Sequence, residues 1–211
     1  PAEVSGLLQT RRDADVFRFP AKAGEVYWID VTAHRQGSDA DPYLLIDQVV
    51  VNDKQEESLK RIAAVDDDGV NPLPFVYDTL SDDPVYRLAV PADGLYQLTV
   101  RDRYSASRGD PSLRYHLSVR PAAPDFRLVS VPSQPVAAGQ KLGATWALGL
   151  RRGDQDSVNV VVLRRDGLDT VIQISAEGLP PGVTCKPIQL GPQQNSGILV
   201  FESAEDAPAW S

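Results

Sequence analysis

Residues 114–120, Arg114-Tyr-His-Leu-Ser-Val-Arg120, are the stretch that decides the fold of this chain. Tyr115, Leu117 and Val119 alternate with charged or polar neighbours. Successive side chains of a β-strand point to opposite faces, so this spacing buries one face and leaves the other in water. The stretch is therefore predicted to be a strand at the surface of a core.

The same period of two returns along the whole chain. It recurs at residues 86–90 and 96–100, which a turn at 91–94 joins, whereas residues 26–31 are apolar on both faces. No window of 11 or more residues keeps a helical period. We therefore expect an all-β chain, with roughly eight or nine strands up to Arg120 and roughly six after it, the spacing of β-sandwiches.

A proline-rich stretch, Arg120-Pro-Ala-Ala-Pro124, separates the two groups of strands. Prolines at this density favour a short, stiff linker. The expected organisation is a first sandwich over residues 1–120, a linker over 121–124 and a second sandwich over 125–211.

Three local expectations accompany this division. In the second half, residues 158–164 are predicted to be a strand, Asp166-Gly167 a hairpin turn and residues 171–176 the returning strand. In the first half, the polar residues 52–60 are expected to form a loop or a short helical turn.

Charge and composition exclude several classes of function. The 211 residues carry 21 Lys and Arg against 29 Asp and Glu, a net charge of −8, with no basic stripe for nucleic acid. No apolar run approaches the length of a membrane span, so membrane insertion is not expected. Cys185 is the single cysteine, which excludes an internal disulfide, and its strand context favours a small buried apolar role.

A series of short motifs gives the first half a family resemblance. In order they are Asp15-Val-Phe-Arg-Phe19, Tyr27-Trp-Ile-Asp-Val31, Asp41-Pro-Tyr-Leu-Leu-Ile46, Ala64-Val-Asp-Asp-Asp-Gly69, Asp93-Gly-Leu-Tyr-Gln-Leu-Thr-Val-Arg-Asp102 and Tyr115-His-Leu-Ser-Val119. Together they span residues 3–120, which resemble the bacterial pre-peptidase C-terminal domain. The resemblance implies a jelly-roll-like sandwich that accompanies other domains of the same polypeptide outside the cytoplasm, in the periplasm, on the cell surface or secreted.

The second half is similar to bacterial immunoglobulin-like modules. The similarity is carried by Arg164-Arg-Asp-Gly167 before a strand and by Gly178-Leu-Pro-Pro-Gly-Val-Thr184. The final strand or strands of such a module are expected to be missing, so that one sheet edge is frayed or paired with a neighbour. The chain is accordingly expected to be a segment of a longer polypeptide.

An acidic window lies between Ile62 and Tyr86, where no Lys or Arg occurs. Its candidate metal ligands are Asp66, Asp67, Asp68, Asp78, Asp82 and Asp83. Calcium prefers carboxylate and carbonyl oxygens on turn-rich backbone, and the resemblance also implies calcium at the paired Asp67-Asp68. The alternative is that these side chains cap turns and stay solvated. Both interpretations stay open at this point.

A long polar loop, residues 101–110, supplies the candidate ligand contacts Arg103, Tyr104 and Arg108. Tyr43, Tyr77 and Trp28 are further aromatic candidates, although aromatic residues within strands usually belong to the core. An exposed aromatic beside arginines suits a glycan or protein ligand.

Catalytic signatures are absent from the sequence. The two histidines, His34 and His116, are about eighty residues apart and both fit a solvated role, and no nucleophile elbow or zinc motif occurs. The sequence therefore predicts a non-catalytic accessory module that binds a glycan, matrix or protein ligand. The alternative is a structural spacer without a ligand, and an enzyme is the least favoured class.

Overall fold

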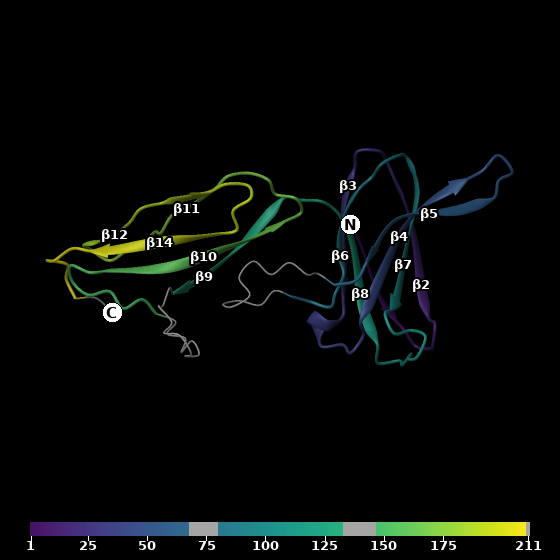
Figure 1. The fold of residues 1–211 in the computed structure, drawn as a ribbon, viewed down its shortest axis with the longest axis horizontal. Coiled ribbons are helices and arrows are strands. Elements are labelled where there is room, and N and C mark those ends of the chain that lie inside the picture. Colours follow the sequence, from purple (N-terminus) through teal and green to yellow (C-terminus); the bar gives the residue numbers. More distant parts are fainter. Residues whose placement is uncertain (68–79, 133–146, 210–211) are drawn as a thin grey trace. The chain divides into compact units, whose positions relative to one another are not determined.

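The computed structural model describes residues 1–67, 80–132 and 147–209, and Figure 1 shows them as a ribbon. The described residues form fourteen strands and one short 3-10 helix, η1 (His34–Gln36). The all-β prediction is confirmed. In this part of the chain no helix has the length and apolar character needed to cross a membrane. The described residues divide into two compact units between Ala123 and Pro124.

The first unit contains eight strands. They are β1 (Ala2–Leu7), β2 (Ala14–Ala21), β3 (Val26–Thr32), β4 (Pro42–Val51), β5 (Glu57–Val65), β6 (Val85–Ala89), β7 (Gly94–Asp102) and β8 (Arg114–Pro121). One sheet has the order β1-β8-β3-β6 and the other the order β2-β7-β4-β5, with every pair antiparallel. This winding of eight strands over two sheets is the jelly-roll arrangement.

The core of the first unit lies between its two sheets. Alternation along β8 buries Tyr115 and Leu117, each 2% exposed, as the sequence predicts. The same inward rows come from the other strands, and they include Ile29, Val31, Leu44, Ile46, Leu88, Tyr96, Leu98 and Val100. Burial of these side chains is the main force that holds the sheets together.

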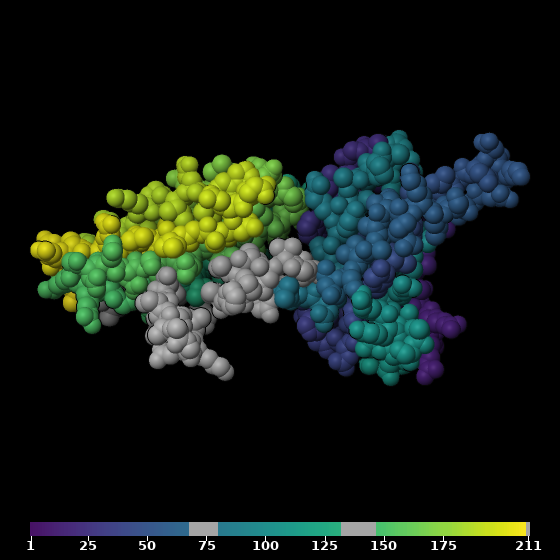
Figure 2. Space-filling view, in the orientation of Figure 1, coloured from purple at the N-terminus to yellow at the C-terminus, as the bar shows by residue number. Residues whose placement is uncertain are grey.

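The prediction of a loop or short turn over residues 52–60 holds for residues 52–56 but is wrong for residues 57–60, because Glu57 already begins β5. Val51 pairs with Glu57 across a tight connection, in which the side-chain oxygen of Asn52 accepts hydrogen bonds from the backbone N–H groups of Lys54 and Glu56. Figures 1 and 2 show this β4–β5 hairpin extending beyond the body of the sandwich. A strand that projects into water needs no buried face, so its sequence lacks the alternation that identifies the others.

The second unit is built from six strands. They are β9 (Asp125–Pro132), β10 (Gln155–Arg165), β11 (Ile172–Ile174), β12 (Val183–Cys185), β13 (Ile188–Leu190) and β14 (Ser196–Ser203). A four-stranded sheet has the order β12-β14-β10-β9, and β11 and β13 form a two-stranded sheet. Val160 and Val162 of the larger sheet join a core with Ile172, Ile174 and other apolar residues.

The expected hairpin around Asp166-Gly167 is wrong in its pairing. Asp166 and Gly167 do adopt the left-handed angles of a tight turn, with φ of 55° and 78°. However, β9 and β14 already flank β10, so β11 crosses to the other sheet and pairs with β13. The expected linker also begins inside the first unit, since Pro121 is the last residue of β8 and lies opposite Tyr27.

Candidate functional site

Loops from three connections meet at one end of the first unit. The backbone N–H of Arg103 donates to the carbonyl of Asp41 at 2.7 Å, that of Arg12 to Ser105 at 2.7 Å, and that of Asp110 to Leu8 at 3.0 Å. We call the residues of this region, 9–13, 41, 66–67 and 103–110, the loop surface. Its acidic and aromatic members are the candidate site.

Three carboxylates converge on this surface. Asp41, Asp66 and Asp67 each place one oxygen within 4.8 Å of the others. Asp41 directly precedes β4 and the other two directly follow β5, and these strands are paired antiparallel. The start of one strand and the end of its neighbour therefore bring the side chains together.

The cluster concentrates negative charge in a partly buried place. Burial, and then the charges of Asp67, Asp102 and Asp82, raise the pKa of Asp41 above its ordinary value. One carboxylate oxygen of Asp41 and one of Asp66 are buried without a hydrogen-bond partner. Arg103 forms an ion pair with Asp66. A hard cation coordinated by oxygen would satisfy the two unpaired oxygens.

The other predicted metal ligands that the structure describes, Asp82 and Asp83, are not members of this cluster. Asp82 is exposed, and the group of converging carboxylates among the described residues does not include it. Asp68 and Asp78 lie outside the described residues. Asp66 and Asp67 are thus the two that the structure brings together among the four predicted ligands it describes.

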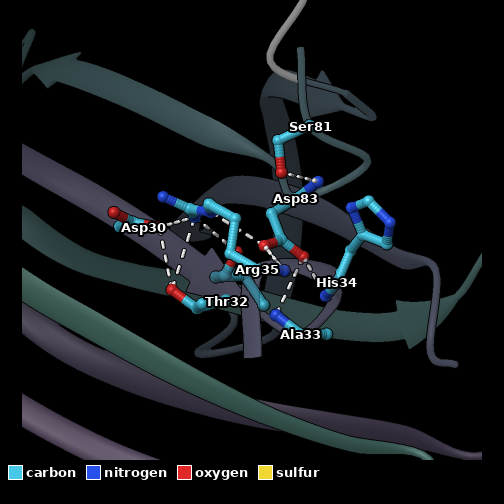
Figure 3. Close-up of polar contacts among 8 residues, drawn as sticks. Asp30, Thr32, Ala33, His34, Arg35, Ser81 and Asp83 are labelled. Carbon is cyan, nitrogen blue, oxygen red and sulfur yellow. Dashed lines mark hydrogen bonds and ion pairs between the residues drawn. The ribbon is translucent and has the colours of Figure 1, made fainter. Parts of the chain in front are cut away.

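Asp83 anchors the chain after β3 (Figure 3). It is 0% exposed, and its two oxygens accept hydrogen bonds from the backbone N–H groups of Ala33, His34 and Arg35 at 2.7–2.9 Å. The guanidinium of Arg35 adds a further bond at 2.8 Å. Burial alone would raise the pKa of Asp83, but these bonds to its charged form outweigh burial and lower it.

Tyr104 is the aromatic residue that the loop surface presents to solvent. Asp102 and Arg108 contact it from the protein side. Asp102, which is 1% exposed, accepts two bonds from the Arg108 guanidinium at 2.6 and 2.7 Å. The guanidinium lies 5.3 Å from the centre of the Tyr104 ring, close enough for a cation–π contact. Asp102 also accepts the backbone N–H of Tyr104 at 2.8 Å. The ring is 55% exposed yet fixed in orientation.

The three predicted contact residues therefore differ in their surroundings. Tyr104 is open to a ligand, whereas Arg108 is turned inward and supports the ring. Arg103 is exposed and pairs with Asp66, which links the contact loop to the acidic cluster.

The remaining aromatic candidates are tied into the sheets or fall outside the described residues. Tyr43 packs under the guanidinium of Arg101, 5.0 Å from the ring centre. Trp28 is half-buried within β3, and Tyr77 is not among the described residues.

The histidines and the cysteine lie on separate elements. His34 begins η1, while His116 lies in β8 with its Nδ1 3.2 Å from the hydroxyl of Ser5. Cys185 packs against the core of the second unit, and burial raises the pKa of its thiol.

Sequence reasoning missed two acidic residues, one in the loop surface and one at the end of β7 beside it. Asp41 and Asp102 were visible only as residues flanking a predicted strand, next to Pro42 and Arg103. A polar residue at the end of a strand is a signal for a loop site, but it does not reveal which strand ends meet.

No family model matches the chain, and no curated protein matches it either. Among solved structures, it is similar to the pre-peptidase C-terminal domain of a collagenase from Bacillus anthracis, with 16% identity and a TM-score of 0.37, over 56% of this chain and 88% of that one. It is also similar to a periplasmic inhibitor of g-type lysozyme from Aeromonas hydrophila, with 22% identity and a TM-score of 0.37, over 57% of this chain and 84% of that one. Neither is described as immunoglobulin-like, so that expectation for residues 125–211 stays a prediction.

Proposed function

We propose that this chain is a non-catalytic binding module of a larger exported protein, and that it contacts a protein or glycan ligand through the loop surface. The observation that carries the proposal is the support of Tyr104 by Asp102 and Arg108. An aromatic side chain that is exposed but already ordered loses little conformational entropy on binding, and tyrosine is enriched where binding energy concentrates.

The non-catalytic character is supported by how the charged groups are arranged. Catalysis needs ionisable groups that converge in a cleft with shifted pKa values. A cavity of about 620 Å³ does lie between β1 and β2, but its lining is mostly apolar and includes Phe17, Phe19, Leu98 and Leu117. The acidic groups of the loop surface lie outside that lining.

The location of the protein and its neighbours in the polypeptide are part of the proposal. They rest on the sequence resemblance of residues 3–120 to domains that accompany secreted and surface proteins. Other domains of the same polypeptide are therefore the expected intramolecular partners.

Calcium is the cofactor proposed for the acidic cluster. Asp41, Asp66 and Asp67 would supply oxygen ligands, and the two buried, unpaired oxygens fit a cation that prefers carboxylates. A bound cation would also lower the pKa of Asp41, because it favours the charged form of the carboxyl group.

The calcium proposal is tested by thermal unfolding with and without chelator. A ligand that binds only the folded state stabilises it by mass action, so millimolar calcium is expected to raise the melting temperature. Asp41→Asn and Asp67→Asn should abolish that shift. Asp53→Asn is the matched control, since this exposed carboxylate lies in the β4–β5 turn, at the far end of the two strands that carry the cluster. An unchanged melting temperature in the unmodified protein would remove calcium from the account.

Binding itself is tested on arrays of glycans and of extracellular matrix proteins, with Tyr104→Ala against the unmodified chain. Leu59→Ala is the control, because Leu59 is 49% exposed and lies on the projecting hairpin. The proposal expects at least one probe whose binding Tyr104→Ala weakens and Leu59→Ala preserves. If no probe distinguishes the two variants, the spacer interpretation replaces this one.

A further inference from the structure

The turn between β1 and β2, residues 9–13, has an unusual backbone at its tip. Arg12 adopts a φ of 63°, a left-handed conformation that favours glycine. The carboxylate of Asp13 accepts backbone N–H bonds from Gln9 at 2.7 Å and from Thr10 at 3.4 Å. The Asp13 side chain thus closes the turn. The turn keeps Arg12 in a backbone conformation that is unfavourable for an arginine. Such outliers concentrate at binding sites.

The loop of residues 103–110 packs against this turn. The backbone N–H of Arg12 donates to the carbonyl of Ser105 at 2.7 Å. Gly109 packs so closely on the backbone of Thr10 that a Cβ at that position would lie 2.0 Å from the Thr10 carbonyl carbon. The two connections therefore act as one rigid surface, and Arg12 is bonded to the residue that follows Tyr104.

Two cationic side chains project from this surface without partners. Arg11 and Arg12 are exposed, and neither guanidinium has a hydrogen bond or ion pair among the described residues. Arg103 and Arg108 differ, since each pairs with an aspartate. A guanidinium offers a planar fork of donors that matches a carboxylate, so two adjacent free arginines select for paired acidic groups.

We infer that Arg11, Arg12 and Tyr104 form a recognition site for an acidic segment of a partner protein. This inference rests on the proposed function and names the chemistry of its ligand. Carboxylates of the segment bind the two guanidiniums, and an apolar side chain or backbone of the partner packs on the free face of the Tyr104 ring. Arg108 is a positioning residue, because it acts through Tyr104.

A protein suits this surface better than a sugar does. The site consists of loop tips, and none of its three residues lines the cavity between β1 and β2. Small ligands and sugars generally bind in concave sites, whereas tyrosine and arginine on loop tips are typical of protein contacts. Charge complementarity supplies the selection, since Arg11 and Arg12 are exposed cations that no carboxylate of the described residues pairs with.

The test measures binding of a fluorescein-labelled oligoglutamate peptide to the full chain by anisotropy. The variant is Arg11→Gln with Arg12→Gly, because glycine suits the left-handed backbone and keeps the turn. The matched control is Arg151→Gln with Arg152→Gln, a second pair of adjacent, exposed arginines in the other unit. The inference expects affinity to fall by about tenfold or more in the first variant and to stay within about twofold in the control.

Tyr104→Ala is expected to weaken peptide binding as well, while raised salt weakens it in the unmodified chain. Equal losses in the two arginine variants would show that any exposed arginine pair attracts the peptide, which overturns the inference. Unchanged binding in the Arg11→Gln, Arg12→Gly variant, with an unchanged melting temperature, overturns it too.

Further probes separate this inference from the proposed function. Heparin oligosaccharides and a neutral glycan array are measured with the same variants. Binding of heparin in place of oligoglutamate, weakened by the Arg11 and Arg12 changes, would overturn the peptide assignment and leave the binding module standing. If no probe shows binding that depends on Tyr104, both the peptide inference and the proposed binding function are overturned.

Discussion

The hydroxyl of Tyr115 donates a hydrogen bond of 2.5 Å to a carboxylate oxygen of Asp15. Tyr115 belongs to β8 and Asp15 to β2, so the bond joins the two sheets of the first unit. The tyrosine is 2% exposed. It therefore ties the sandwich together with a polar contact to a charged acceptor, which is stronger than one between neutral groups.

The substitution Tyr115→Phe tests this contact through the stability of the protein at alkaline pH. Burial, then the hydrogen bond to Asp15 and the charges of Asp15 and Asp13, raise the pKa of Tyr115 above its ordinary value of 10.0. Because the folded state holds this proton more tightly, its contribution is complete below about pH 10 and is lost as pH rises further. The free energy of unfolding in urea should fall above pH 10 in the unmodified chain and fall less in Tyr115→Phe. Tyr104→Phe, at an exposed ring, should follow the unmodified chain.

Gly6→Ala should destabilise the first unit. Gly6 lies opposite Tyr115, and a Cβ there would come 2.3 Å from the tyrosine ring. The ring must move, which strains the buried contact with Asp15, so we expect a loss of about 1–3 kcal/mol in the free energy of unfolding. Gly149→Ala is the control, because a Cβ at Gly149 meets nothing within 4 Å. Equal stability of the two variants in urea would contradict the packing described.

Asp83→Asn should change the response to acid. The pKa of Asp83 is lowered from its ordinary 3.8, so its contribution is complete above about pH 4 and is lost as pH falls through the folded-state pKa. The unmodified chain should therefore lose stability below about pH 4, and Asp83→Asn should lose less over that range. Asp93→Asn provides the comparison, since the Asp93 carboxylate accepts one backbone N–H, that of Ala23. A parallel pH profile in Asp83→Asn would contradict the anchoring role.

Cys185 should react slowly with a thiol reagent. Burial raises the pKa of its thiol, and the thiolate is the reactive form. At pH 8 the folded chain is expected to react with Ellman's reagent more slowly than the urea-unfolded chain. Equal rates in the folded and unfolded chain would show that the fold of the second unit does not shield the Cys185 thiol from the reagent.

The strands in which apolar and polar residues alternate were predictable from sequence. The strands whose position depends on long-range pairing were not. Residues 114–120 have a buried face that the sequence displays, and they form β8 as predicted. Residues 57–60 form part of a hairpin that extends from the sandwich, and their polar side chains carry no such period. The partner of β11 also depends on which sheet edges are filled, a property of the whole unit.

The candidate site was predictable in its residue types but not in its grouping. Asp66, Asp67 and Tyr104 were identified from local composition. Their neighbours Asp41 and Arg12 come from distant connections, and only the folded sheets place those beside them. The inward direction of Arg108 was not predictable for a different reason: its partner Asp102 is close in sequence, but its burial at the end of β7 depends on how the sheet packs.

The most direct test of the central claim is to map the ligand contact by amide chemical shifts in the full chain. A probe that binds, whether oligoglutamate or an array hit, is titrated into labelled protein. The account predicts that the largest shifts fall on residues 9–13 and 103–110, two loops that the backbone hydrogen bond from Arg12 to Ser105 joins. Shifts concentrated on the β4–β5 hairpin or on the second unit, with these two loops unaffected, would contradict it.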